Sequence, residues 1–357
     1  MRTMSIGFPA APYLSGFDSA LIWNTIRATR AGNPGRTPFE VDRRMEYAAS
    51  LEQFEQLMRA AAAVGPATRP LPLFYAIEQG GRALLAAFED DAEWPNRNAR
   101  ESNRHGLTDK PDPGYDAWFS RRWLTFKEKG LFPRVLALFD GYTPPTEAIQ
   151  IGAAWSALPD LIKTRIPERE WPRAVPVTLS RVGPDDDGMG LTIQLDGVEG
   201  HFPSAPSPES VQARLQDLLR AHPDLAGWQI ERVGLGTWSI ETHKLLNVDA
   251  TIGWTFDDGT YDDLSAMTLA LEHRRHDARW LIPALNSANE QLPAFMIWWA
   301  LLYGLSIQAR YHPARWYEAL AINVSLYAVP IEDLLNEALG AVPQLLLERI
   351  AAKPFLL

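Results

Sequence analysis

Apolar side chains recur three or four positions apart in the first part of the chain. This spacing predicts an amphipathic helix over residues 39–64, and Gly65-Pro66 ends it. A second helix is predicted from about Pro72 to Phe88. Because the link between the two is short, the helices should pack antiparallel. Gly80-Gly81 in the second helix indicates the close approach of another backbone.

The middle of the chain changes period. Residues 89–115 are polar and predict a loop, and helical spacing returns at 132–138 and 146–164. Alternating stretches at 175–182 and 189–195 predict strands joined by a Gly- and Asp-rich hairpin loop. A short helix at 207–221 and strands at 228–242 and 248–256 complete a small α/β module.

The last part is predicted to be helical from Leu281 to Ile350. Within it, residues 292–307 are apolar on every side, and a helix of that kind must be buried all round. This run is shorter than the roughly 20 residues of a membrane span. We expect it to form the centre of the fold, and we expect no membrane association.

The order of helices, strands and helices predicts an α+β fold. It consists mainly of a helical bundle formed by the N- and C-terminal segments, with a small α/β insertion. The expected parts are an N-terminal extension (1–37), the first part of the bundle (38–171), the insertion (172–263) and the second part of the bundle (264–357).

Composition excludes several kinds of chemistry. The 357 residues include no cysteine, which excludes disulfides, thiolate nucleophiles and cysteine-ligated metals. The N-terminus lacks a signal-peptide pattern, so a cytoplasmic protein is expected. No Gly-rich phosphate loop, Gly-x-Ser-x-Gly elbow or His-Glu-x-x-His pair occurs. The Asp-rich stretches 185–188 and 257–263 lack calcium-loop spacing and predict turns. We expect neither a metal nor a cofactor.

Three short segments resemble a known family. They are Arg69-Pro70-Leu71-Pro72-Leu73-Phe74-Tyr75-Ala76, His105-Gly106-Leu107, and Ala309-Arg310-Tyr311-His312-Pro313 with Trp316. In order and spacing they resemble the YaaC-like proteins of bacteria. The resemblance covers most of the chain and implies an architecture, but it implies no particular activity.

The N-terminal helices are also similar to the HEPN group of nucleotide-binding helical bundles. Some members of that group are RNases with an Arg-x(4–6)-His motif, and Arg100 to His105 matches this pattern. The resemblance implies a metal-independent RNase in which His105 moves a proton and Arg100 stabilises the phosphorane charge. The family motif begins a helix, whereas Gly106 favours a loop here. The alternative is that His105 braces a turn.

Residues 97–134 form a basic segment on an acidic chain. The segment holds nine basic and five acidic residues, whereas the whole chain has a net charge of −10. Arginine forks bind phosphate and aromatic rings stack on bases. The candidate ligand-binding residues here are Arg97, Arg104, Trp118, Arg121 and Arg122. The alternative is a solvated loop that its aromatic residues anchor to the core.

A second polar cluster follows the apolar run. The cluster consists of Arg310, His312, Arg315 and Trp316. These residues are expected either to brace the structure, with Arg310 paired to a carboxylate such as Glu78, or to form a small anion pocket lined by Arg310 and His312. Three functions therefore remain open. The first is a nucleotide- or nucleic-acid-responsive protein of bacterial defence or stress response. The second is the RNase, and the third is a scaffold that binds a protein partner through the insertion.

Overall fold

The computed structural model describes residues 19–31, 41–90, 93–94, 104–110, 119–139, 141–164, 166–167, 171–185, 188–195, 208–223, 229–234, 237–239, 244–246, 249–255, 274–275 and 278–352. The chain divides into two compact units. The helical unit comprises Met1–Trp155, Lys163–Glu170 and Leu292–Leu357, and the sheet unit comprises Ser156–Ile162 and Trp171–Gln291.

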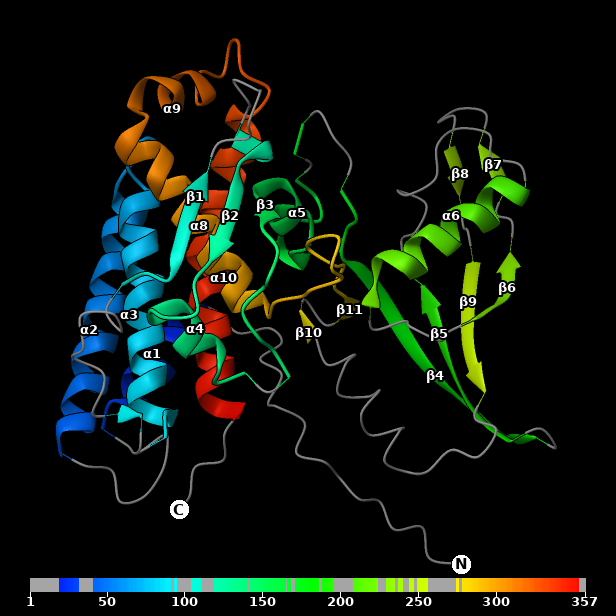
Figure 1. The fold of residues 1–357 in the computed structure, drawn as a ribbon, viewed down its shortest axis with the longest axis horizontal. Coiled ribbons are helices and arrows are strands. Elements are labelled where there is room, and N and C mark those ends of the chain that lie inside the picture. Colours follow the sequence, from blue (N-terminus) through cyan, green and yellow to red (C-terminus); the bar gives the residue numbers. More distant parts are fainter. Residues whose placement is uncertain are drawn as a thin grey trace, which may run out of the picture. The chain divides into compact units, whose positions relative to one another are not determined.

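The helical unit is a bundle built from both ends of the chain (Figure 1). Helix α3 packs against both α2 and α8, and α10 packs against α1, α2, α3 and α8. The mainly helical α+β fold is therefore confirmed. The elements of this unit are α1 (Ser19–Thr29), α2 (Val41–Ala63), α3 (Pro70–Phe88), β1 (Leu107–Lys110), η2 (Phe119–Arg121), β2 (Trp123–Phe126), α4 (Leu131–Leu136), β3 (Ile149–Gln150), α5 (Ile151–Ser156), α8 (Ala294–Tyr311), α9 (Pro313–Ala319) and α10 (Ala328–Ala352).

Helix α8 is the core of this unit, as its apolar pattern predicts. Trp298 and Trp299 are both fully buried. Gly81 of α3 lies against Trp299, since a Cβ atom at Gly81 would lie 2.3 Å from Cζ3 and 2.4 Å from Cη2 of the indole ring. The close approach expected at Gly80-Gly81 is therefore real, but at Gly81 the neighbour is a side chain and not a backbone. The indole fills the space that the missing side chain leaves.

A small antiparallel sheet lies beside the helices and breaks two of the predicted segments. Its strand order is β1-β2-β3, so the polar stretch predicted as a loop contains the strand β1. The helix predicted at 146–164 is divided into β3, α5 and the 3-10 turn η3 (Pro159–Leu161). Pairing of Ile149 with Leu124 in the sheet overrides the helical spacing.

The sheet unit contains a six-stranded sheet, in the order β10-β11-β4-β5-β9-β6, and a separate two-stranded sheet, β7-β8. The predicted hairpin joins β4 to β5, and the predicted short helix is α6. The bounds are β4 (Val175–Asp185), β5 (Gly188–Leu195), α6 (Pro208–Ala221), β6 (Gln229–Gly234), β7 (Thr237–Ser239), β8 (Lys244–Leu246), β9 (Asp249–Thr255), β10 (Arg274–Arg275) and β11 (Ala278–Leu281).

The sheet extends beyond residue 263, the expected end of the insertion. Leu281 pairs with Val175 of β4, so the chain is still in the sheet where a helix was predicted to begin. Helix α8 begins only at Ala294, directly after Pro293. Proline has no backbone N–H group that would be left unpaired, so it suits the start of a helix.

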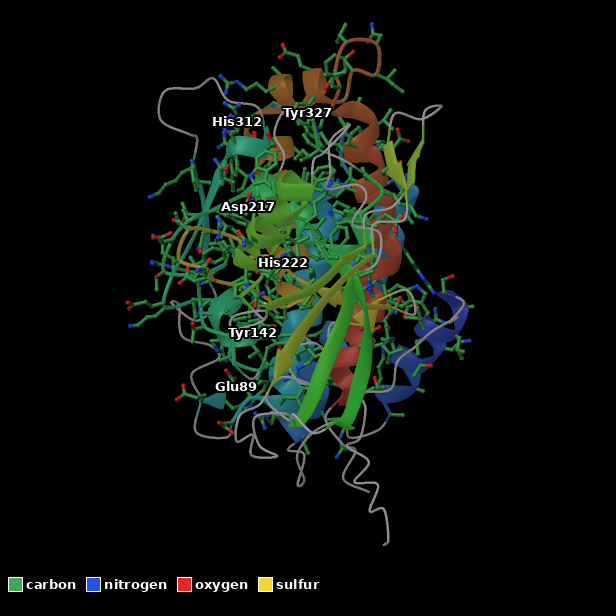
Figure 2. The ribbon with its side chains drawn as sticks, turned by 90° about the vertical axis from the view of Figure 1, so that its right-hand side faces the viewer. Glu89, Tyr142, Asp217, His222, His312 and Tyr327 are labelled. Carbon is green, nitrogen blue, oxygen red and sulfur yellow. The ribbon has the colours of Figure 1, made fainter. Side chains whose placement is uncertain are left out.

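A buried histidine holds the end of α6 (Figure 2). The side chain of His222 is almost fully buried. Its Nδ1 lies 2.7 Å from the Leu218 carbonyl oxygen and its Nε2 lies 3.0 Å from that of Arg173. Burial lowers the pKa of His222, and the two backbone contacts oppose this shift. The imidazole thus links the end of α6 to the chain just before β4.

Candidate functional site

The loop that carries His105 is fixed by its own backbone. Gly106 has a φ angle of +80°, where glycine is favoured. The carbonyl oxygen of Arg104 accepts a 2.7 Å hydrogen bond from the N–H of Leu131, and that of His105 accepts one of 3.1 Å from Phe132. The residues before β1 therefore form a loop that caps the start of α4. This agrees with the loop that Gly106 indicated.

Glu78 of α3 orients the imidazole of His105. The Nδ1 atom lies 3.1 Å from Glu78 Oε1. The Glu78 side chain is 7% exposed and that of His105 is 38% exposed, so the pair joins a buried carboxylate to a solvent-accessible ring. With Nδ1–H donating to Glu78, the Nε2 atom is left to accept or deliver a proton. No other described residue forms a hydrogen bond with this ring.

Aromatic rings enclose the pair on the protein side. The ring centroid of Phe74 lies 5.2 Å from that of His105 in an edge-on arrangement, and that of Tyr303 lies 6.0 Å away. Burial, with a smaller contribution from the Asp109 charge, raises the pKa of Tyr303. Its hydroxyl donates to the carbonyl oxygen of Leu107 at 3.1 Å. The imidazole is thereby held between α3, α8 and β1.

Arg310 lies near the same face of α3, but its partner differs from the one predicted. Its Nη1 donates to the hydroxyl of Tyr75 at 3.0 Å. The predicted pairing of Arg310 with Glu78 is wrong, because Glu78 binds His105. The Arg310 charge also acts on Tyr303, where it opposes the rise in pKa. His105 and Arg310, which are far apart in sequence, therefore belong to one neighbourhood, which we call the α3–α8 cluster (Tyr75, Glu78, His105, Tyr303 and Arg310).

A buried ion pair supports this cluster. Arg122 donates to both carboxylate oxygens of Asp109, with contacts of 2.6–3.0 Å. The two side chains are only 7% and 2% exposed. Gln308 of α8 adds a third hydrogen bond to Asp109, at 3.1 Å. The Asp109 carboxylate of β1 therefore links Arg122, the residue before β2, to Gln308 of α8. Arg122 would reach a ligand only if its pair with Asp109 broke.

The other residues of the predicted basic segment are divided. Arg104 is exposed beside His105, and Arg121 is half-buried in η2. Arg134 is paired with Glu89 at 2.6 Å. Arg97, Arg100 and Trp118 lie outside the described residues. Pairing thus neutralises two of the basic side chains, Arg122 and Arg134.

The last predicted residues lie where α8 ends and α9 begins. His312 is the residue between the two helices, and its N–H donates to Gln308. Trp316 is buried, and its Nε1 donates to the carbonyl oxygen of Ala67 at 2.9 Å. Because Ala67 lies in the connector between α2 and α3, Trp316 fastens α9 to that connector. This geometry agrees with a bracing role for Trp316.

The described residues hold neither a metal-binding group of side chains nor a membrane-spanning helix. Among them, no three His, Asp or Glu side chains gather closely enough to hold a metal ion. Within the same part of the chain, no helix combines the length and the apolar character that crossing a bilayer requires. Of the Asp-rich stretches predicted as turns, residues 186–187 and 257–263 lie outside the described ranges.

Sequence reasoning missed Tyr75, Tyr303 and Asp109, and it assigned Glu78 to the wrong partner. One signal was present. Glu78 is a lone carboxylate in a helix that is otherwise largely apolar on its buried side, and a buried carboxylate requires a partner. The sequence alone did not decide between His105 and Arg310 as that partner.

Comparison with known proteins identifies one family. The searches of curated proteins and of solved structures find no match. The YaaC-like protein family matches residues 33–350, a range that includes all three segments on which the resemblance was based. The structure joins those segments through the contacts of Tyr75 with Arg310 and of Phe74 with His105. The chain therefore belongs to the YaaC-like protein family.

Proposed function

We propose that this protein is a nucleotide- or nucleic-acid-responsive bacterial protein whose ligand binds at the α3–α8 cluster. The observation that carries the proposal is the half-exposed imidazole of His105, fixed by the buried Glu78 beside the Tyr75–Arg310 pair. An arginine fork and an imidazole suit phosphate oxygens, and a partly exposed tyrosine ring suits a base. The resemblance of the N-terminal sequence to the HEPN group supports the further proposal that the protein acts in a defence or stress response.

The charge of the site favours a small ligand. The chain carries a net charge of −10, so its overall field repels a long polyanion. Among the described residues, few basic groups around the cluster remain for a ligand, since Arg122 and Arg134 are paired with Asp109 and Glu89. Two or three phosphate contacts correspond to a slope of log affinity against log salt of about −1.5 to −2 for a single strand. This is the behaviour of a nucleotide or a short single-stranded segment.

A thermal-shift screen of the full chain against nucleotides and short single-stranded RNA tests the proposal. A ligand at 100 times its Kd stabilises the folded state by about 2.7 kcal/mol, so the melting temperature should rise by several degrees. Arg310→Gln should weaken binding by about tenfold or more, because a charge-assisted hydrogen bond to phosphate is lost. Arg44→Gln, at an exposed position of α2, is the matched control and should bind as the wild type does. A screen in which no nucleotide or RNA raises the melting temperature would refute the proposal.

The Glu78–His105 pair also favours a second candidate function, metal-independent RNA cleavage. In this reaction, Nε2 of His105 takes the proton of a ribose 2′-hydroxyl and the 2′-oxygen attacks the adjacent phosphorus. The bond from phosphorus to the 5′-oxygen then breaks, and the leaving oxygen takes up a proton. The products are a 2′,3′-cyclic phosphate and a 5′-hydroxyl. Glu78 would hold the imidazole in position, and Arg100 would stabilise the phosphorane.

Incubation of the pure protein with total RNA in the presence of a chelator tests this second function. We expect His105→Ala and Arg100→Ala to abolish cleavage, and we expect Glu78→Gln to reduce it. The Arg44→Gln variant should cleave as the wild type does. If the wild type does not cleave, or if both alanine variants still do, this function is refuted. The nucleotide-binding proposal would then still be decided by the thermal-shift result.

A further inference from the structure

Exposed apolar side chains gather at one end of the helical unit. The described part of the chain has ten exposed large apolar residues, and six of them lie within residues 311–329. Their exposed fractions lie between 52% and 77%. We call these six the apolar end surface: Tyr311, Tyr317, Ile322, Val324, Leu326 and Val329. A cluster of this kind is unusual on a monomer and marks an interaction surface.

The backbone beneath this surface is ordered by hydrogen bonds. The N–H groups of Val324 and Ser325 both donate to the carbonyl oxygen of Ala321, at 3.0 and 2.8 Å. Two buried aromatic residues anchor the segment. Trp316 binds the α2–α3 connector, and the hydroxyl of Tyr327 lies 3.2 Å from that of Ser120. Figure 2 places His312 and Tyr327 toward the end of this unit that carries α9, with Glu89 toward the other end. Such a fixed frame lowers the entropy cost of association.

The charge of the surface allows it to meet its own copy. Residues 311–331 contain one arginine and one glutamate, Arg315 and Glu318, so this stretch is neutral with His312 uncharged. The chain as a whole carries −10. The net charge makes two copies repel each other, and a neutral stretch that faces its equivalent adds no repulsion of its own.

The area of the surface fits a dimer of ordinary size. With about 200 Å² for a tyrosine and about 100 Å² for an aliphatic side chain, the six exposed fractions amount to roughly 550 Å² of apolar area. A standard interface buries about 800 Å² on each partner, and somewhat more than half of that area is apolar. The apolar end surface therefore supplies the apolar part of one complete interface.

We propose that the apolar end surface is the interface of a symmetric homodimer, in which residues 311–329 of one copy pack against the same residues of the other. An isologous contact requires a patch that is compatible with itself. A neutral, apolar and pre-ordered patch satisfies this requirement. The proposal is independent of the α3–α8 cluster and of its ligand.

Sedimentation equilibrium of the full chain over a range of concentrations tests the proposal. We expect a monomer–dimer equilibrium for the wild type. Leu326→Glu places one negative charge from each copy in the interface and should raise the dissociation constant of the dimer at least tenfold. Ile322→Ser removes apolar area and should also raise it. Met45→Glu is the matched control, because Met45 is 66% exposed on α2 and lies outside residues 311–329. It should leave the equilibrium unchanged.

The comparison of variants is valid only for folded proteins. Circular dichroism and melting temperatures must show that each variant is folded. Should Leu326→Glu fail to fold, the serine variant gives the same comparison. A wild type that stays monomeric at the highest concentration would overturn the proposal, even if the surface bound lipid vesicles or another protein. So would a dimer that survives both interface substitutions, or one that Met45→Glu disrupts equally.

Discussion

Substitution of Gly81 by alanine tests the packing at the centre of the helical unit. The new Cβ atom would lie 2.3 Å from Cζ3 of Trp299 and 3.1 Å from Cγ2 of Val135, whereas carbon atoms pack at about 3.5–4.0 Å. The indole would have to move by more than about 1 Å. It is fully buried, and Phe132 and Phe295 meet it edge-on at 6.0 and 6.2 Å. It therefore has little room to move.

The magnitude follows from two opposing effects. Overpacking of a well-filled core costs about 1–3 kcal/mol, and the contact here is short enough for the upper part of that range. Alanine in place of glycine in a helix interior contributes about 1 kcal/mol of stability. We therefore expect Gly81→Ala to lower the free energy of unfolding by about 2 kcal/mol. Gly340 of α10 has open space around it, so Gly340→Ala should be neutral or should raise stability by up to about 1 kcal/mol.

Urea denaturation followed by tryptophan fluorescence measures both variants. The combination of Gly81→Ala with Trp299→Phe provides a second test, because the smaller ring leaves space for the methyl group. The double variant should lose at least about 1 kcal/mol less than the sum of the two single variants. A Gly81→Ala protein as stable as the wild type would refute the packing argument, and so would additive effects in the double variant.

Three further substitutions test other contacts. Asp109→Asn removes the charge that faces the buried Arg122 guanidinium and should destabilise the protein by about 3–5 kcal/mol in urea denaturation; a loss below about 1 kcal/mol would contradict this reading. Trp316→Phe leaves the carbonyl oxygen of Ala67 without its indole donor and should cost about 1–3 kcal/mol, whereas Tyr317→Phe on the exposed side of α9 should have little effect. Burial lowers the pKa of His222, so the unfolded chain takes up a proton at a higher pH than the folded chain does; stability should therefore fall as the pH drops below about 6.5. The fall should be smaller in His222→Gln, and equal pH profiles in urea denaturation would contradict the assignment.

The elements that the sequence predicts well are those whose pattern has a single physical solution. Residues 292–307 are apolar on every side, so burial at the centre was the one available outcome. The prediction of a helix at 146–164 was wrong because Ile149 and Gln150 pair with β2. The local sequence pattern gives no sign of this strand pairing. The start of α8 was placed too early for a similar reason, since Leu281 belongs to a ladder with β4.

The α3–α8 cluster shows where sequence reasoning stops. His105 and Arg310 were both recognised as candidates, but their relation depends on which face of α3 each approaches. Glu78 was expected to bind Arg310, and the choice of His105 instead is decided by the loop that Gly106 and the start of α4 hold in place. The choice between His105 and Arg310 as the partner of Glu78 depends on tertiary packing, so it cannot be predicted from the spacing of residues in the sequence.

The dependence of α3 on α8 has a consequence during protein synthesis. Helices α2 and α3 are complete when Phe88 has left the ribosome, but the indole that covers Gly81 belongs to residue 299. At about 5–20 residues per second, the nascent chain waits roughly 10–40 s for that covering. Through this interval α3 has α2 and α4 as neighbours, but the side that faces α8 in the finished fold still lacks its partner. The helical unit therefore completes its core only after the C-terminal third of the chain has been translated.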